Sequence, residues 1–350
     1  MKKIAIILFN LGGPDSQAAV RPFLQNLFSD PRILRVPGLI RPLLARLIAR
    51  RRTPFAQEIY RQMGGASPII PNTQAKARAL EQALASEGEV KCFIAMRYWH
   101  PRAAAVVRQV AAFAPDELIL LPLYPQFSTT TTESSVAEFW REIQHDDGPL
   151  HAAWGKTLNP KTICCYPQEP GFIQSLAATI RPLYAAAAAH GKPRLLLSAH
   201  GLPEKIIAAG DPYQWQCEQT AAALVKTLAI PDLDWGVCYQ SRVGPLKWIG
   251  PATSDEIIRA GRDKCPLVIA PIAFVSEHSE TLVELDIEYR HLARENGVPH
   301  YARAPAVTAM PDFIAGLAAQ IRMALQSERH LVCPNGERLC PKGYKGCPAA

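Results

Sequence analysis

The sequence has no apolar run long enough to cross a membrane. A spanning helix needs about 18 to 20 consecutive apolar residues, and no stretch of this 350-residue chain approaches that length. Lys2 and Lys3 followed by the apolar residues 4–9 look like the start of a secretion signal, but the run is too short and lacks a small-residue cleavage site. We therefore interpret residues 4–9 as a buried first strand and expect a cytoplasmic protein.

A dinucleotide fingerprint and a nucleic-acid groove are also missing. Residues 10–14 read Asn-Leu-Gly-Gly-Pro, so the first strand is not followed by G-x-G-x-x-G, which counts against a nucleotide-using oxidoreductase. The paired glycines indicate either a tight turn or a backbone that a ligand approaches closely. The net charge is a modest +7, and the basic cluster at residues 41–52 lacks interleaved aromatic side chains. An anionic small molecule or a membrane surface is therefore favoured over nucleic acid.

A strand-helix rhythm occurs twice in the sequence. Residues 4–9, 91–96 and 117–123 predict buried strands in the first half, and residues 194–199, 234–239 and 265–274 do so in the second. With 48% hydrophobic residues, the chain can bury one large core or two ordinary ones. The rhythm favours two doubly wound α/β domains with parallel sheets flanked by helices, and a cleft lined by the carboxyl ends of the strands.

The expected domain boundaries follow from breaks in this rhythm. His-Asp-Asp-Gly-Pro at residues 145–149 interrupts both helical and strand periodicity, which predicts a linker near residues 144–149. We expect a first domain over residues 1–147, a second over 148–310, a C-terminal helix over 311–328, and a cysteine-rich tail over 329–350.

Residues 34–55 combine an apolar stripe with cations. The stripe consists of Leu39, Ile40, Leu43, Leu44, Leu47 and Ile48, and the cations are Arg41, Arg46, Arg50, Arg51 and Arg52. The pattern is typical of a helix that lies at a membrane surface, and peripheral contact with the inner membrane is our hypothesis. An amphipathic helix packed on the protein core would show the same stripe, so periodicity leaves both interpretations open.

A row of acids follows the last predicted strand. Glu280, Glu284 and Glu288 recur every four residues, which places three carboxylates on one helix face at a cost of a few tenths of a kcal/mol per pair. Cations, shared protons or water must offset that repulsion, although an outer face whose first-turn acids suit the helix dipole would look the same. His200 follows the strand at 194–199 and precedes Gly201, a position that suits a metal ligand or a proton acceptor near neutral pH. A lone histidine is more commonly structural.

Six motifs, in order, carry a resemblance to a known family: residues 10–14, 97–101, 124–135, 198–203, 240–250 and 271–289. Together they resemble the ferrochelatases, which insert ferrous iron into a porphyrin to make heme, and the match runs from residue 4 to about residue 326. The resemblance implies two Rossmann-like, chelatase-type domains with the porphyrin between them. It places the family's invariant histidine at His200 and its essential glutamate at Glu280, where both would contact the Fe²⁺ substrate. Glu284 and Glu288 would then carry protons or iron.

Porphyrin contacts are expected at Leu11, Arg97, Tyr98, Ser128 and Trp248. A guanidinium pairs with propionate carboxylates, and an aromatic face stacks on a flat ring. The resemblance implies protoporphyrin IX as substrate, with coproporphyrin as the alternative, and either a monomer or a homodimer. A heme or porphyrin carrier of the same fold is a hypothesis of another class. Such a carrier needs the arginine and aromatic contacts but has no use for the acid row.

The tail suggests a metal cofactor. Cys333, Cys340 and Cys347 are seven residues apart in a segment rich in proline and glycine, where thiolates have little reason to gather except around a metal. Some ferrochelatases carry a [2Fe–2S] cluster on three C-terminal cysteines and one upstream ligand, and the resemblance implies such a cluster here. The animal enzymes take the fourth ligand from the hydroxyl-rich motif, where this sequence has a threonine, so Cys164 is expected instead, with Cys165 as the alternative. A tetrahedral Zn²⁺ site and uninvolved tail cysteines are the rival interpretations.

Overall fold

The computed structural model describes residues 1–34, 36–145, 151–152, 158–242 and 246–349. The predicted linker and the 147/148 boundary fall largely on residues 146–150, which are outside this set, as are residues 243–245 of the fifth motif. The chain divides into two compact units. Unit 1 comprises Met1–Cys165 with Leu317–Glu337, and unit 2 comprises Tyr166–Gly316 with Arg338–Pro348.

Unit 1 is built on a parallel sheet with the order β2-β1-β3-β4-β9. Its strands are β1 (Lys3–Asn10), β2 (Glu89–Met96), β3 (Glu117–Pro122), β4 (Lys161–Ile163) and β9 (Leu331–Val332). The central β1 is a continuous apolar run, as expected for a parallel strand covered on both faces, and its Ile7 lies opposite Phe93 of β2 and Leu120 of β3.

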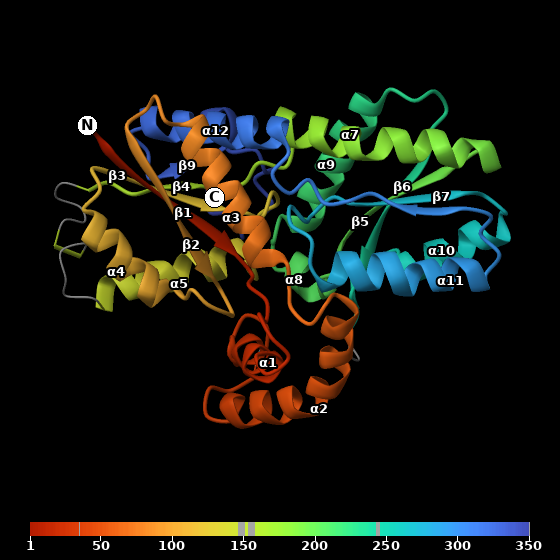
Figure 1. The fold of residues 1–350 in the computed structure, drawn as a ribbon, viewed down its shortest axis with the longest axis horizontal. Helices are drawn as coiled ribbons and strands as arrows, with labels where there is room; N and C mark the ends of the chain where they lie inside the picture. Colours follow the sequence, from red (N-terminus) through yellow and green to blue (C-terminus); the bar gives the residue numbers. More distant parts are fainter. Residues whose placement is uncertain (35, 146–150, 153–157, 243–245, 350) are drawn as a thin grey trace. The chain divides into compact units, whose positions relative to one another are not determined.

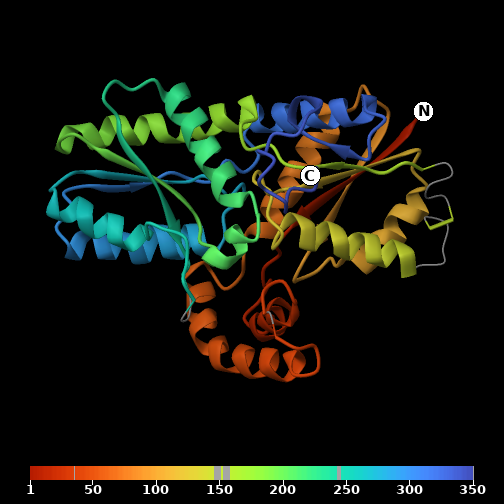
Figure 2. The same ribbon diagram turned by 180° about the vertical axis from the view of Figure 1, so that it is seen from behind.

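Helices cover both faces of this sheet. α3 (Ile69–Ala83) and α12 (Pro311–Gln326) lie on one face, and α4 (Ala103–Phe113) and α5 (Thr132–His145) on the other (Figures 1 and 2). Val106 and Val110, one turn apart on α4, pack with Phe9 and Phe139 in the buried core. α1 (Val20–Ser29) and α2 (Arg41–Gln62) pack on each other beyond the carboxyl end of β1 (Figure 1).

Unit 2 repeats the plan with a parallel sheet of order β6-β5-β7-β8. Its strands are β5 (Arg194–His200), β6 (Asp234–Gln240), β7 (Leu267–Pro271) and β8 (Tyr301–Arg303). α7 (Pro170–Ala187) and α9 (Tyr213–Leu228) lie on one face, and α10 (Thr253–Arg262) and α11 (Tyr289–Glu295) on the other (Figures 1 and 2). The described ranges also contain the short elements η1 (Ala188–His190) and α8 (Glu204–Ala208) of unit 2 and η3 (Pro334–Gly336) of unit 1. The two parallel sheets flanked by helices confirm the predicted fold class.

The helix that carries the acid row has an unusual form. Glu280–Glu288 is a π-helix, η2, that runs directly into α11. The sequence predicted an ordinary helix here. A π-helix, whose backbone bonds join residues five apart, occurs mostly as a short segment at functional sites, and this one contains all three glutamates of the acid row.

Candidate functional site

Three elements of unit 2 bring polar side chains to one edge of its sheet. β5 ends at His200, β6 ends at Gln240, and η2 begins at Glu280. His200 and Gln240 are paired residues of neighbouring parallel strands, so their side chains start from the same carboxyl edge, which is where open α/β sheets bind ligands.

His200 and Glu280 face each other across a short gap. The Nδ1 atom of His200 lies 2.6 Å from the carbonyl oxygen of Gly201. Because a carbonyl oxygen only accepts, Nδ1 carries a proton, and in the neutral ring Nε2 therefore presents a lone pair. That Nε2 lies 3.7 Å from Oε1 of Glu280, and the buried Oε2 of Glu280 has no hydrogen-bond partner among the described residues. Two electron-rich atoms therefore converge on a place that suits a proton or a metal cation.

The turn after His200 is fixed by a glycine. The Gly201 amide donates to the carbonyl oxygen of Gln240 at 2.8 Å. A Cβ atom at position 201 would lie 2.9 Å from that oxygen and 3.3 Å from the Trp248 ring, so a larger residue would push the turn away. The close approach holds the His200 backbone against β6.

Glu284 is bound by four donors. Its Oε1 accepts from the Ser241 amide at 2.8 Å and the Tyr289 hydroxyl at 3.0 Å. Its Oε2 accepts from Nε2 of Gln240 at 3.0 Å and from the Ser241 hydroxyl. These hydrogen-bond donors offset the repulsion between carboxylates that the spacing of the acid row predicted. Glu288 lies nearer the surface, and partial desolvation together with the charge of Glu284 raises the pKa of its carboxyl group.

Gln240 links the strands to the acid row. It is buried, its Oε1 accepts from the Ser198 hydroxyl at 2.8 Å, and its Nε2 also donates to the Glu280 carbonyl oxygen at 3.1 Å. Gln240 was not predicted to have a role of its own. Its position as a polar residue at the carboxyl end of a predicted strand could have indicated a place in the site.

Glu277 and His278 hold the start of η2. Glu277 pairs with Nη1 of Arg303 at 2.9 Å and accepts the Ala306 amide at 3.0 Å. Desolvation lowers the pKa of His278. Its Nδ1 accepts the Glu280 amide at 3.1 Å, which requires a neutral ring with the proton on Nε2. The two histidines of the site therefore have opposite tautomers.

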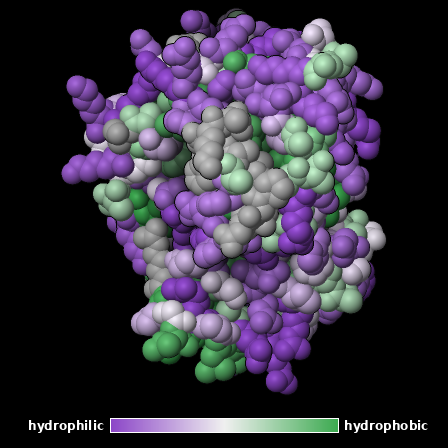
Figure 3. Space-filling model, turned by 90° about the vertical axis from the view of Figure 1, so that its left-hand side faces the viewer, coloured by the Kyte–Doolittle hydropathy of each residue, from purple (hydrophilic) through white to green (hydrophobic). Residues whose placement is uncertain are grey.

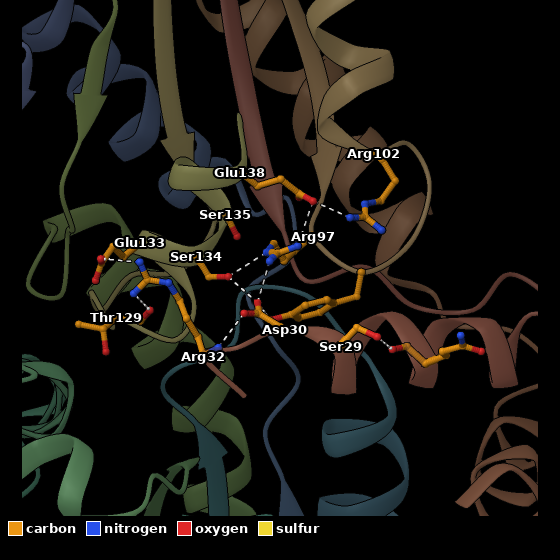
Figure 4. A network of polar contacts seen from close by, with 12 residues as sticks. Ser29, Asp30, Arg32, Arg97, Arg102, Thr129, Glu133, Ser134, Ser135 and Glu138 are labelled. Carbon is orange, nitrogen blue, oxygen red and sulfur yellow. Dashed lines mark hydrogen bonds and ion pairs between the residues drawn. The ribbon is translucent and has the colours of Figure 1, made fainter. Parts of the chain in front are cut away.

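Arg97 belongs to a polar network inside unit 1 (Figure 4), and Tyr98 shares its partner Asp30. The Arg97 guanidinium donates to Asp30 at 2.8 Å, to Ser134 at 2.8 Å and pairs with Glu138 at 3.0 Å. The buried Tyr98 donates its hydroxyl to Asp30 at 2.8 Å. Burial favours the neutral Asp30 carboxyl, but these donors and the Arg32 amide outweigh it and lower its pKa. Every guanidinium nitrogen of Arg97 thus has a partner in the protein, and contact with a porphyrin stays a prediction.

The other three residues that are expected to contact the porphyrin differ in their burial and in their hydrogen-bond partners. Ser128 is buried, with its hydroxyl 2.9 Å from that of Thr130. Leu11 is partly buried against the α1–α2 cluster. In unit 2, the buried Nε1 of Trp248 lacks a partner within the described part of the chain, so this indole is able to donate to a ligand. The roles of these three residues also stay predictions.

The cysteines of the expected cluster are all buried. Cys164 and Cys165 pack with Cys333 in one small group of unit 1. Cys340 and Cys347 are buried in unit 2, where Nε2 of Gln216 donates to the Cys340 sulfur at 3.1 Å. Across the described ranges, no group of three or more His, Cys, Asp or Glu side chains is arranged to hold a metal ion.

The apolar stripe of residues 34–55 is largely exposed. Leu39, Leu43 and Leu47 are 97%, 73% and 50% accessible, and buried Ala45 and Ala49 form the inner side of α2. Hydrophobic side chains gather beside hydrophilic ones at the end of the molecule where α1 and α2 lie (Figure 3). Leu44 and Ile48 of the same stripe are half-buried, so the stripe is exposed along its outer edge only. None of the described helices is long and apolar enough to span a membrane.

Comparisons with known proteins match the chain to one family. A family model described as Ferrochelatase matches residues 3–325. The chain is 52% identical over 349 residues to a ferrochelatase of Phenylobacterium zucineum, covering 99% of this chain and 97% of the relative. It is also 52% identical over 354 residues to a ferrochelatase of Caulobacter vibrioides, with the same coverage. Among solved structures, SirB from Bacillus subtilis with Fe³⁺ has a TM-score of 0.53 at 10% identity, covers 93% of this chain and 96% of its own, and so shows the fold alone.

The family match therefore spans β1 to β8 and the edge where His200, Gln240 and Glu280 meet, and it ends before β9. Relatives at about half identity extend over nearly the full length of the chain. The chain belongs to the ferrochelatase family, and it is a porphyrin metal chelatase of heme synthesis.

Proposed function

We propose that this chelatase inserts Fe²⁺ into protoporphyrin IX and that His200 and Glu280 handle the metal and the pyrrole protons. The observation that carries the proposal is the 3.7 Å gap between Nε2 of His200, with its lone pair free of the ring proton, and a carboxylate oxygen of Glu280. A neutral imidazole and a carboxylate are both suitable ligands for a divalent first-row metal, and either group can accept a proton.

The reaction requires proton removal as well as metal delivery. A free-base porphyrin holds two inner N–H protons on a flat ring, so the ring must bend, two protons must leave, and Fe²⁺ must lose part of its water shell. Nε2 of His200 would accept a pyrrole proton, and Glu280 would receive the proton or the entering metal. Glu284 and Glu288 would continue that path, since they follow Glu280 along η2 and Glu288 is exposed at its last position.

A pair of substitutions tests these roles. His200→Ala and Glu280→Gln should each lower the turnover of anaerobic Fe²⁺ or Zn²⁺ insertion by about 10²–10⁴-fold, the range for loss of a positioned acid or base. Porphyrin binding, followed by fluorescence, should persist. His291→Ala is the matched control, because its side chain is 71% exposed on α11. Wild-type turnover in either site variant would refute the assignment.

The choice of porphyrin is part of the proposal. Protoporphyrin IX and coproporphyrin differ by two propionates, so each additional carboxylate would need a cationic or polar partner. We expect kcat/KM for protoporphyrin IX to exceed that for coproporphyrin under the same anaerobic assay. A higher value for coproporphyrin would overturn this choice while leaving the chelatase activity intact.

We further propose that the exposed end of α2 binds the cytoplasmic face of the inner membrane peripherally. Apolar Leu39, Leu43 and Leu47 project beside exposed Arg46, Arg50 and Arg51. Apolar side chains that enter the acyl boundary and cations that meet anionic headgroups together produce reversible attachment. Such a site suits an enzyme whose porphyrin substrate is itself poorly soluble in water.

We also propose that Cys164, Cys333, Cys340 and Cys347 bind a [2Fe–2S] cluster, with Cys165 as the alternative to Cys164. Four buried sulfurs suit the thiolate set that such clusters take, and the packing of Cys333 with the Cys164–Cys165 pair supports an upstream ligand from that pair. A bound cluster would supply a redox-active iron centre. Thiolates also suit Zn²⁺, so metal content decides between the two.

A further inference from the structure

A chain of hydrogen bonds leads from the first turn of α10 to η2 within unit 2. It begins at Thr253, the first residue of α10, whose Oγ1 lies 3.2 Å from Oγ of Ser198 on β5. Ser198 donates to Oε1 of Gln240 at 2.8 Å. Nε2 of Gln240 donates in turn to the Glu280 carbonyl oxygen at 3.1 Å and to Oε2 of Glu284 at 3.0 Å. Two hydroxyl groups and one amide therefore connect α10 and β5 to two glutamates of the acid row.

The direction of each bond in this chain follows from the groups at its end. Carboxylate and carbonyl oxygens only accept, so both hydrogens of the Gln240 NH₂ group point to η2 and its Oε1 points to Ser198. A hydroxyl has one proton, and Ser198 donates its proton to Gln240, so Thr253 is the donor between the two hydroxyls. A reversed amide would place Oε1 against the oxygens of both glutamates. The Ser198 hydroxyl therefore supports the orientation in which Gln240 can bind Glu280 and Glu284.

Gln240 contacts both members of the proposed reactive pair. Its backbone carbonyl oxygen accepts the Gly201 amide at 2.8 Å, which holds the turn directly after His200. Its side chain binds the backbone of Glu280, the residue whose Oε1 lies 3.7 Å from Nε2 of His200. Ser198, Thr253 and Gln240 are buried, so the partners of their polar groups must come from the protein. The orientation of one buried amide thus affects how the two reactive side chains face each other.

We propose that Ser198 and Thr253 are positioning residues for the reaction: they orient the Gln240 amide, which holds Glu280 and Glu284 in place relative to His200. The inference rests on the proposed roles of His200 and Glu280. A displacement of about 1 Å in a reacting group can cost on the order of 100-fold in rate, so partial release of the Gln240 amide is enough to be measured.

A double-mutant cycle tests whether Ser198 acts through Gln240. Ser198→Ala removes the donor to Oε1, and Gln240→Leu removes the amide while keeping a side chain of similar size. We expect Ser198→Ala to lower kcat for Zn²⁺ insertion at least about fivefold, with a smaller change in the KM for porphyrin, and Gln240→Leu to lower kcat by at least as much. In the Gln240→Leu background, Ser198→Ala should lower kcat by less than about twofold, because substitutions in one hydrogen-bond network are not additive.

Two substitutions of Thr253 separate loss of the hydroxyl from a change of shape. Thr253→Val keeps the shape without the hydroxyl and should lower kcat at least about twofold, a smaller loss because Ser198 can still donate to Gln240. Thr253→Ser keeps the hydroxyl and should retain the wild-type kcat. Thr220→Val is the matched control, because Thr220 is equally buried on α9 and donates its hydroxyl to the Pro167 carbonyl oxygen at 2.7 Å. That variant loses a buried hydrogen bond outside this chain and should also keep the wild-type kcat.

Wild-type kcat in Ser198→Ala, or an equal loss from this substitution in both backgrounds of the cycle, would overturn the inference. A loss in Thr220→Val as large as that in Thr253→Val would do so too, because general destabilisation would then account for both. The Thr253 pair with its control decides alone if Ser198→Ala or Gln240→Leu does not fold. His200→Ala is assayed alongside: wild-type turnover by that variant would refute the proposed function, whereas an uncoupled cycle refutes only the role of Ser198 and Thr253.

Discussion

Glu284 accepts four hydrogen bonds at the candidate site. The Ser241 N–H donates to Oε1 and Nε2 of Gln240 donates to Oε2, and neither group can accept a hydrogen bond instead. The hydroxyls of Ser241 and Tyr289, which also donate to this carboxylate, can act as donors or as acceptors. A glutamine at position 284 would place its NH₂ group against one of these two donors in either orientation of the amide. The substitution therefore leaves a donor unsatisfied.

We expect Glu284→Gln to lower the free energy of unfolding by about 1–3 kcal/mol, the usual cost of an unsatisfied buried polar group. Urea denaturation measures the loss as a lower midpoint. Glu288→Gln is the control, because that side chain lies at the surface and should change stability by less than about 0.5 kcal/mol. Equal stabilities of the two variants would contradict the four-donor description.

His278 makes stability depend on pH in a defined direction. Desolvation places its folded-state pKa below the usual value of 6.5, so below that pH the unfolded chain binds a proton that the folded ring resists. Its contribution is thus fully present above about pH 6.5 and is lost as the pH falls toward the folded-state pKa. Asparagine can keep the acceptor for the Glu280 amide without titrating.

His278→Asn should therefore flatten the decline in the free energy of unfolding between about pH 6.5 and pH 5. Denaturant titrations at several pH values give the slope directly. A variant whose slope equals that of the wild type would show that other groups, such as His300 with its own lowered pKa, account for the acid sensitivity.

At the residue scale, the sequence indicated candidate reactive side chains but not the residues with which side chains form hydrogen bonds. The family resemblance named His200 and Glu280 together, and the structure places Nε2 of His200 3.7 Å from Oε1 of Glu280, while their roles in the reaction stay predictions. The internal network of Arg97 and Tyr98 could not be predicted, because its acceptor Asp30 lies 67 residues before Arg97 in the chain. Long-range hydrogen bonds of this kind leave no periodic signal.

At the scale of elements, strands of five residues or more could be predicted, and the shortest could not. β4, β8 and β9 have two or three residues each, too few to show a period or a composition bias. η2 could be recognised as helical, but a spacing of four residues between acids is compatible with both an α-helix and a π-helix. Burial also required the structure, since the same stripe on α2 would fit a core or an exposed helix.

The exposed stripe leads to a prediction about membrane binding. Replacing Leu39, Leu43 and Leu47 with serine should weaken binding to anionic vesicles at least about tenfold, equivalent to about 1.4 kcal/mol, because burial of an apolar side chain contributes about that much or more. Added salt should weaken wild-type binding by screening the arginines.

Leu246→Ser is the control for this triple variant, because Leu246 is 46% exposed in a loop that follows β6. It should bind vesicles like the wild type. Since the three stripe leucines are already exposed, the triple variant should keep its thermal midpoint. Unfolding of that variant, or unchanged vesicle binding, would contradict a membrane role for α2.

At the scale of the whole molecule, the C-terminal segment contributes to both compact units. Leu317–Glu337 returns to unit 1, where β9 extends the sheet beside β4, and Arg338–Pro348 belongs to unit 2. Sequence periodicity predicted two domains in chain order with a separate tail. It could not predict that residues 317–337 belong to unit 1, because a strand of two residues has no sequence pattern of its own and pairs only with a sheet that is already folded.

The proposed cluster leads to the last prediction, since its thiolates come from distant parts of the chain. Protein purified without oxygen should be reddish-brown and contain iron and inorganic sulfide in equal amounts. Cys340→Ser should remove most of the visible absorbance, because the cluster would lose one of four thiolates. Cys265→Ser is the control: that cysteine is only partly buried beside Ala260 and should leave the colour unchanged. Colourless wild-type protein would refute the cluster, with stoichiometric zinc pointing to a tetrahedral Zn²⁺ site instead, and neither result would alter the expectations for His200 and Glu280.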